Sequence, residues 1–209
     1  MYIVCSDLEG VFIPEIWINV AEKTGIPELR LTTRDISDYD VLMKKRLQIL
    51  KENHLKLSDI QAVINTMNPL EGALAFLDWL RSITQVIVVS DTFKEFAGPM
   101  MKKLGMPTLF CHSLTIDASG MIVSYDLRQQ RAKEKTTLAM KSLNYQIIAM
   151  GDSYNDIAML KAADRGILFR PPENVIREFP EFPVTHDYDS LKELIQAIIN
   201  ESLFSNNGP

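Results

Sequence analysis

The chain has 209 residues, of which 46% are hydrophobic, and this is enough to bury the core of one α/β domain with a modest insertion. Its formal net charge of -5 argues against a nucleic-acid-binding protein that works through a basic surface. No apolar run approaches the roughly 20 residues that cross a bilayer, so we expect no membrane partner. From the net charge we likewise expect no nucleic-acid partner. Asp7 and Glu9 interrupt the first apolar run, which disfavours a signal peptide and predicts a cytoplasmic protein with two reduced cysteines, Cys5 and Cys111.

Apolar runs of strand length alternate with helix-period segments along the chain. We expect buried strands at 2–6, 85–90, 145–150 and 166–169, and helices at 71–82, 93–104, 136–143, 154–163 and 190–199. Continuous β-branched runs that alternate with helices are typical of a parallel sheet covered on both faces. The pattern therefore predicts an α/β protein with a Rossmann-like parallel sheet core.

Two segments depart from this alternation. Residues 14–67 carry helix-period patterns and contain no obvious strand, which predicts a small helical cap inserted after the first strand. Residues 114–127 alternate apolar and polar side chains around a central Ala-Ser-Gly, which predicts a β-hairpin insertion. We therefore expect a core of residues 1–13 and 68–200, a cap of residues 14–67 that sets substrate specificity, and a disordered tail of residues 201–209.

Acidic side chains follow three of the predicted strands. Asp7 and Glu9 follow the first strand. Ser90 is at the tip of the second strand, with Asp91 directly after it, and the sequence GDSYND (151–156) follows the third. Because the carboxyl ends of parallel strands meet at one edge of a sheet, we expect these side chains to lie together. An aspartate after a strand is often a turn residue or a helix N-cap, but that alternative does not explain why acids follow all three strand ends.

The spacing of Asp7 and Glu9 places both carboxylates on the same side of an extended backbone. Gly10 would then let the chain turn sharply without a Cβ clash. If a helix begins just after Asp152, both this residue and Asp156 can approach Asp7. So many carboxylates repel one another unless a cation lies between them, and ligands that are all oxygen atoms favour Mg²⁺.

These strand ends resemble the motifs of the haloacid dehalogenase superfamily of phosphotransferases. DLEGV (7–11) is similar to its first motif, VVSDT (88–92) to its second, and GDSYND (151–156) to its metal-binding motif. The helices of residues 14–67 resemble the cap of that superfamily, so the resemblance covers nearly the whole chain. The chain also resembles the phosphoserine phosphatase branch, in which a glutamate stands in the first cap helix and an arginine in the cap. This branch includes members that also transfer phosphoryl groups to homoserine.

The resemblance implies a reaction and a role for each motif residue. It implies Mg²⁺-dependent hydrolysis of O-phospho-L-serine through an aspartyl-phosphate, with Asp7 as the nucleophile and Glu9 as the general acid and base. Ser90 would hydrogen-bond the phosphoryl group and Asn155 would help to bind the substrate. Mg²⁺ would be held by Asp7, the backbone carbonyl of Glu9, and Asp152. The resemblance also implies homoserine as a second small-molecule substrate and leaves open whether the chain forms a homodimer.

Two further predicted contacts have ordinary local alternatives. Lys133 and Lys135 both lie near the start of a predicted helix, where either could neutralise a phosphoryl group or be a solvated surface lysine, and the resemblance points to Lys133. Glu15 follows Pro14 at a helix start, where an acidic residue is favoured for local reasons. The resemblance makes Glu15 the partner of a substrate ammonium group.

Arg46 can be selected within the cap on physical grounds. Its neighbours three and four positions away on the helix are all apolar: Leu42, Met43, Ile49 and Leu50. Arg46 is therefore predicted to face inward more strongly than the adjacent Lys44 and Lys45. An inward guanidinium seeks an anion, and a substrate carboxylate fits it in two-point fashion. The alternative is an internal salt bridge to a carboxylate of the cap.

Two residues depart from the pattern of the branch. Asp91 stands where a glycine is typical and adds bulk and charge beside the phosphate, so we include it among the substrate-binding residues. Glu9 is longer than the aspartate common in the superfamily. Both could change whether water or a second alcohol reaches the aspartyl-phosphate. Two other functions stay open: a phosphatase of another small phosphate ester, such as a nucleotide or sugar phosphate, and a non-catalytic phosphate-binding module.

Overall fold

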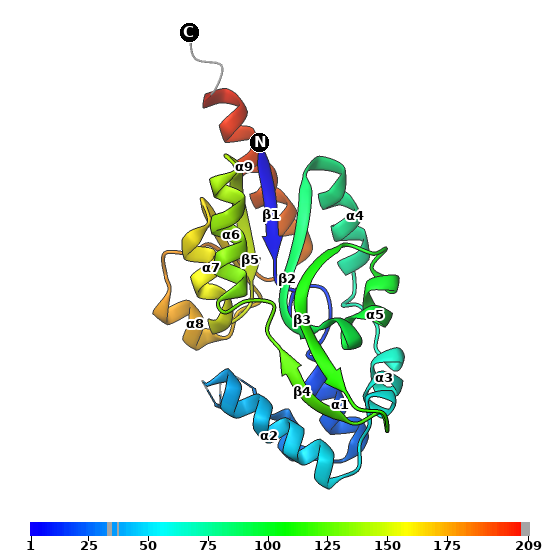
Figure 1. The fold of residues 1–209 in the computed structure, drawn as a ribbon. Helices are drawn as coiled ribbons and strands as arrows, with labels where there is room; N and C mark the ends of the chain where they lie inside the picture. Colours follow the sequence, from blue (N-terminus) through cyan, green and yellow to red (C-terminus); the bar gives the residue numbers. More distant parts are fainter. Residues whose placement is uncertain (33–34, 37, 206–209) are drawn as a thin grey trace.

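A seven-stranded sheet forms the centre of the computed structural model, which describes residues 1–32, 35, 36 and 38–205 (Figure 1). The strand order is β4-β3-β2-β1-β5-β6-β7, and every neighbouring pair is parallel except β3 and β4. The strands are β1 (Tyr2–Ser6), β2 (Gln85–Phe93), β3 (Thr108–Ile116), β4 (Ile122–Asp126), β5 (Gln146–Gly151), β6 (Arg165–Phe169) and β7 (Val184–Thr185).

Helices cover both faces of this sheet, as the continuous apolar runs of the strands require. Alternate residues of β1 enter two separate cores: Tyr2 and Val4 pack on one face, and Ile3 and Cys5 on the other. The first core is shared with α4 (Ala73–Ile83), α5 (Lys94–Lys103) and α9 (Tyr188–Ser205). The second lies beneath α6 (Ala132–Ser142), α7 (Ile157–Ala162) and α8 (Glu173–Glu178). The predicted Rossmann-like α/β core is confirmed.

The helical cap lies between β1 and α4 in the sequence and below the carboxyl ends of the strands in space (Figure 1). It consists of α1 (Ile16–Thr24), a 3₁₀ turn η1 (Pro27–Arg30), α2 (Tyr39–Glu52) and α3 (Leu57–Thr66). The predicted β-hairpin is formed by β3 and β4, and it runs beside α2.

The hairpin and the cap are joined by specific contacts. The Leu57 backbone N–H donates to the Gly120 carbonyl over 3.0 Å, and the Tyr125 hydroxyl donates to the Asp40 carboxylate over 2.5 Å. Lys56 and Met121 also form an isolated antiparallel bridge. The hairpin thus supports the cap through contacts with α2 and with the start of α3.

The elements differ from the sequence prediction mainly at their ends. The predicted hairpin strand is the second half of a longer strand, because Thr108 to Phe110 first pair with β2 in parallel. Helix α6 begins at Ala132 rather than at 136, since Arg131 takes a left-handed backbone conformation and starts the helix earlier. We expected a disordered tail from residue 201, but helix α9 continues to Ser205, because no glycine or proline interrupts it. The rest of that predicted tail, 206–209, lies outside the described residues.

Both cysteines are free thiols; Cys5 is buried and Cys111 is partly exposed. Among the described residues, no helix is long and apolar enough to cross a membrane.

Candidate active site

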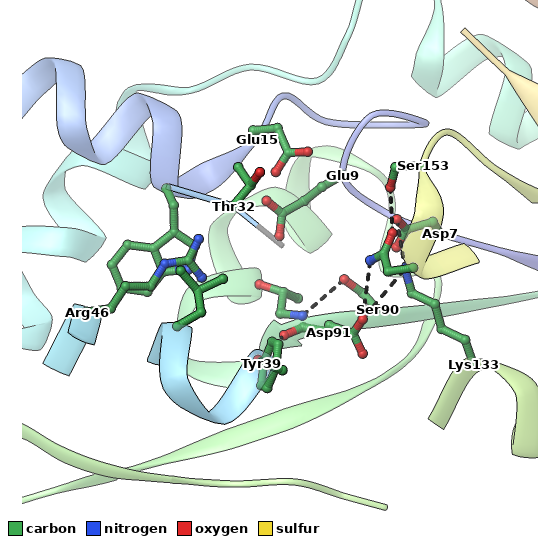
Figure 2. A pocket seen from close by; sticks show the side chains of 14 residues that line it. Asp7, Glu9, Glu15, Thr32, Tyr39, Arg46, Ser90, Asp91, Lys133 and Ser153 are labelled. Atoms are coloured by element: carbon green, nitrogen blue, oxygen red, sulfur yellow. Dashed lines mark hydrogen bonds and ion pairs between the residues drawn. The ribbon is translucent and has the colours of Figure 1, made fainter. Parts of the chain in front are cut away.

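A cavity of about 80 Å³ lies between the carboxyl ends of the central strands and the cap (Figure 2). It contains eight of the nine predicted site residues, and the ninth, Asp152, lies beside it in contact range of Asp7. The lining side chains come from three strand ends, from the cap and from helix α6: Asp7, Glu9, Glu15, Trp17, Thr32, Tyr39, Leu42, Arg46, Ser90, Asp91, Thr92, Lys133, Ser153 and Asn155.

The loop after β1 turns its two acids toward this cavity. Asp7 and Glu9 both line it, while Leu8 between them is fully buried in the core, as the alternation of an extended chain predicts. Gly10 has a φ of 76°, and a Cβ at this position would lie 2.5 Å from the carboxylate of Asp152. Glycine is therefore required both for the turn and for the close approach of Asp152.

Three buried carboxylates gather at this loop. Ligand oxygens of Asp7, Asp152 and Asp156 all lie within 4.8 Å of one another. Burial and the charge of Asp156 raise the pKa of Asp7 well above its ordinary value, and the same two causes raise the pKa of Asp152 to about 7. Such mutual repulsion favours a cation among the three groups.

Lys133 supplies part of that positive charge. Its ammonium lies 2.7 Å from Asp156 Oδ1 and 3.0 Å from Asp7 Oδ2, and the side chain is only 5% exposed. Burial alone would lower the pKa of Lys133, but the neighbouring charges of Asp156 and Asp7 raise it well above its ordinary value. Lys135 is exposed to solvent, so the structure distinguishes the two lysines that the sequence left as alternatives.

Asp156 has a role that the sequence did not reveal. One of its carboxylate oxygens accepts from Lys133, and the other accepts the backbone N–H groups of Asp152 and Ser153 over 3.0 and 3.1 Å. These bonds engage both oxygens of Asp156, so it orients the lysine and the loop. Together with Asp7 and Asp152 it forms a cluster whose potential metal ligands are all carboxylate oxygens. This all-oxygen donor set fits Mg²⁺. The sequence predicted that Asp156 can approach Asp7, and this is confirmed, but it did not predict these bonds.

The carboxylate of Glu9 reaches the start of the first cap helix, α1. Its Oε2 accepts the backbone N–H of Ile16 over 2.8 Å, and so Glu9 satisfies a free donor of the α1 N-terminus. Burial, together with the charge of the neighbouring Glu15, raises the pKa of Glu9 to about 8. Glu9 therefore carries a proton near neutral pH, which suits a general acid. Glu15 precedes the helix and turns its carboxylate into the cavity (Figure 2).

Arg46 faces inward, as its apolar helix neighbours predicted, and is 7% exposed. Its guanidinium lies 4.5 Å above the Trp17 ring, and one Nη donates to the Leu31 carbonyl over 2.7 Å. Its Nε is buried and has no hydrogen-bond partner among the described residues. Burial lowers the pKa of Arg46 to about 10, so it remains a cation at neutral pH. Because the guanidinium is positively charged, this buried donor is suited to an anionic ligand.

Ser90 and Asp91 leave the regular pairing of β2. The register between β2 and β3 shifts between Val89 and Phe93, which turns Ser90 and Asp91 toward the cavity. Ser90 Oγ accepts the backbone N–H of Thr92 over 3.2 Å, which leaves its hydroxyl proton available. Burial alone would raise the pKa of Asp91, but the charge of Lys133 lowers it to about 2.

Two residues near Asp91 were not predicted. The Tyr39 hydroxyl of α2 donates to the Asp91 carbonyl over 3.0 Å, and His112 Nε2 on β3 lies 3.4 Å from Asp91 Oδ1. Both come from segments far away in the sequence. A histidine within the apolar run of a strand was the one visible signal for His112.

Comparisons with known proteins identify the family of this chain. Residues 11–164 match the family of haloacid dehalogenase-like hydrolases. The chain is 63% identical, over 93% of its length and 83% of the relative, to a phosphoserine phosphatase of Pseudomonas syringae pv. tomato. It is 62% identical, over 94% of its length and 97% of the relative, to the phosphoserine phosphatase ThrH of Pseudomonas aeruginosa. A solved phospho-aspartyl intermediate analogue of phosphoserine phosphatase shares the fold, with a TM-score of 0.74 at 21% identity over 93% of this chain and 97% of that one.

Proposed function

The chain belongs to the haloacid dehalogenase-like hydrolases, and on this premise we propose that it hydrolyses O-phospho-L-serine to L-serine and phosphate. The choice of substrate rests on Arg46, whose Nε has no hydrogen-bond partner among the described residues. Arg46 shares one cavity with the carboxylate of Glu15 and with Asp7. A cation and an anion beside a nucleophile fit a small phosphate ester with one carboxylate and one ammonium group.

The reaction proceeds in two steps. A carboxylate oxygen of Asp7 attacks phosphorus, the bond to the serine oxygen breaks, and Glu9 gives its proton to that oxygen. In the second step Glu9 takes a proton from water, whose oxygen attacks phosphorus and releases Asp7. The pKa of Glu9 near 8 supports this alternation, since both of its protonation states are accessible near neutral pH.

Lys133, Ser90 and Asn155 hold the phosphoryl group during both steps. Lys133 provides a fixed positive charge 3.0 Å from the attacking carboxylate of Asp7, and the other two provide neutral hydrogen-bond donors. Phosphoryl transfer depends mainly on positioning and on stabilising the charge of the oxygens. Asp91 lies behind these groups and contacts two of them, Lys133 and Asn155.

Asp7, Asp152 and the backbone carbonyl of Glu9 would hold Mg²⁺. When bound, the ion supplies positive charge to the phosphoryl oxygens and relieves the repulsion among the buried carboxylates. The support in this chain is the oxygen-only donor set and the close approach of Asp152 that Gly10 permits.

The amino-acid part of the substrate lies toward the cap. Arg46 pairs with its carboxylate and Glu15 with its ammonium group, so the two ends fix the direction in which the phosphate points to Asp7. We further propose that homoserine binds these same two residues after serine leaves, and that Glu9 deprotonates the homoserine hydroxyl for attack on the aspartyl-phosphate. Homoserine keeps both charged ends and differs from serine by one methylene.

The division of the chain and its setting are parts of the same proposal. Residues 1–13 and 68–200 act as the catalytic core and residues 14–67 as the specificity cap. The protein acts in the cytoplasm, where free thiols such as Cys5 and Cys111 stay reduced. Light scattering of the purified protein would decide whether it is a homodimer.

A turnover assay tests the function. Pure protein with phosphoserine and Mg²⁺ should release phosphate, and Asp7→Asn should abolish the release because the amide is not a nucleophile. Activity that survives Asp7→Asn would contradict the mechanism. Addition of homoserine should yield O-phosphohomoserine. Faster turnover of a nucleotide or sugar phosphate would favour another phosphatase, and phosphate binding without turnover would favour a binding module.

A further inference from the structure

A buried histidine lies directly behind the active-site acid Asp91. The side chain of His112 is 3% exposed, and its ring packs against the rings of Tyr39 and Phe93, with centroids 6.2 and 6.3 Å away. Its Nδ1 accepts the backbone N–H of Arg128 over 3.1 Å. Because Nδ1 is an acceptor in this bond, the ring proton lies on Nε2. That nitrogen is 3.4 Å from Asp91 Oδ1.

The contacts continue from Asp91 across the phosphoryl side of the cavity. Asp91 Oδ2 accepts from Asn155 Nδ2 over 3.3 Å and lies 3.9 Å from the ammonium of Lys133. Asn155 Oδ1 in turn accepts the Ser153 hydroxyl. Figure 2 shows Asp91, Ser90 and Lys133 on one side of the cavity, with Glu15 and Arg46 on the other. The row of contacts that starts at His112 therefore reaches the phosphoryl side of the cavity.

Asp91 also lines a second cavity. Its side chain is 33% exposed, and this cavity of about 510 Å³ lies on its far side, lined among others by Gln130 and Tyr154. A charged carboxylate beside this open space would gain water if it turned away from the phosphate site. The donor of His112 opposes that movement, because it lies at the back of the same second cavity and faces Asp91.

We propose that His112 is a positioning residue for phosphoryl transfer, which donates its Nε2 hydrogen to Asp91 and thereby fixes Asn155 and Lys133 beside the phosphate. The proposal rests on the proposed function in one respect only, namely that this cavity transfers phosphoryl groups. It assigns no contact between His112 and the substrate. The effect of His112 should therefore appear at the phosphate and not at the amino-acid end.

Two substitutions separate this role from a purely structural one. In His112→Asn the amide oxygen can replace Nδ1 and keep the bond to Arg128, but no donor reaches Asp91. In His112→Gln the amide nitrogen can replace Nε2 and restore that donor. We expect His112→Asn to lower kcat about 10-fold, near the lower end for one hydrogen bond to a charged group because the Nε2–Oδ1 distance is 3.4 Å, and His112→Gln to recover most of this loss.

Product inhibition supplies the decisive measurement. The inhibition constant of inorganic phosphate should rise about 10-fold in His112→Asn, the size of the same hydrogen bond, and stay close to wild type in His112→Gln. Inhibition by L-serine should stay within about twofold of wild type in both variants, because no bond near Arg46 or Glu15 changes. The proposal is overturned if the two variants behave alike, or if serine inhibition weakens as much as phosphate inhibition.

Controls keep the test independent of folding and of the natural substrate. Thermal unfolding of each variant is compared with wild type, and if His112→Asn does not fold, Asp91→Ala removes the acceptor of the same contact. Asp91→Ala should weaken phosphate inhibition while serine inhibition stays near wild type, and an equal weakening of serine inhibition would overturn the proposal. Turnover of p-nitrophenyl phosphate reports the phosphoryl steps even if phosphoserine is not the substrate, so the two proposals can fail separately.

Discussion

Substitution of Arg46 by methionine tests how the cavity recognises its substrate. The guanidinium is 7% exposed, and its Nε has no partner among the described residues, so a substrate carboxylate would gain charge-assisted bonds in a buried setting. A hydrogen bond to a charged group contributes about 1.5–3 kcal/mol, and loss of one partner of a buried charged pair costs about 2–5 kcal/mol. Taking about 3 kcal/mol, we expect Arg46→Met to raise KM for phosphoserine about 100-fold.

The matched substrate for this assay is O-phosphoethanolamine, which keeps the phosphate and the ammonium group but has no carboxylate. Phosphate release is measured for both esters with wild type and variant. Arg46→Met should change KM for phosphoethanolamine less than about threefold, because the bonds of the missing carboxylate do not exist in either protein. The ratio of kcat/KM between the two esters should therefore fall by about two orders of magnitude.

Arg46→Lys is the matched control variant. It keeps the positive charge above Trp17 but loses the two-point geometry of the guanidinium, so KM for phosphoserine should lie between those of wild type and Arg46→Met. Equal losses on both esters would refute the reasoning, because they would place the effect of Arg46 on cap folding and not on the carboxylate. Thermal unfolding of both variants measures that contribution, which includes the lost bond to the Leu31 carbonyl.

Three further predictions concern the chemistry at the strand ends. The pKa of Glu9 near 8 means that its acid form is lost as pH rises through about 8, so kcat/KM for phosphoserine should fall above that pH. Glu9→Gln should remove this alkaline decrease from the pH profile, together with most of the activity. Lys133→Met should lower kcat by about 10²-fold or more, whereas Lys135→Met, at an exposed position, should stay near wild type in the same assay. Gly10→Ala should displace Asp152 and raise the Mg²⁺ concentration for half-maximal activity about 10-fold or more, which a metal titration measures; an unchanged titration would contradict the close packing at Gly10.

The sequence predicted those parts of the site that depend on strand ends. A buried parallel strand has a continuous apolar run, and the residue at which the run stops marks the sheet edge, so the positions of Asp7, Ser90 and Asp152 could be predicted from the sequence. Arg46 could be predicted for a similar reason, because helix periodicity alone decides which way it faces.

Other parts of the site depend on contacts that periodicity does not encode. The choice between Lys133 and Lys135 depended on where α6 begins, and a left-handed residue at Arg131 moved that start by four positions. The roles of Asp156 and His112 come from side-chain bonds across 23 and 21 positions in the chain, to Lys133 and Asp91 respectively. No local pattern in the sequence specifies such pairs.

The pairing of hairpin and cap sets a rule for building chimeras. The cap is a single stretch of chain, which invites grafting of residues 14–67 between relatives to exchange substrate preference. Yet the bond from Leu57 to Gly120 and the bond between Tyr125 and Asp40 cross to a segment about 60 or more positions away. A graft of the cap alone would leave the recipient's hairpin facing a foreign surface. A chimera should therefore exchange residues 108–126 together with the cap, because these two separate segments of the chain form one structural unit.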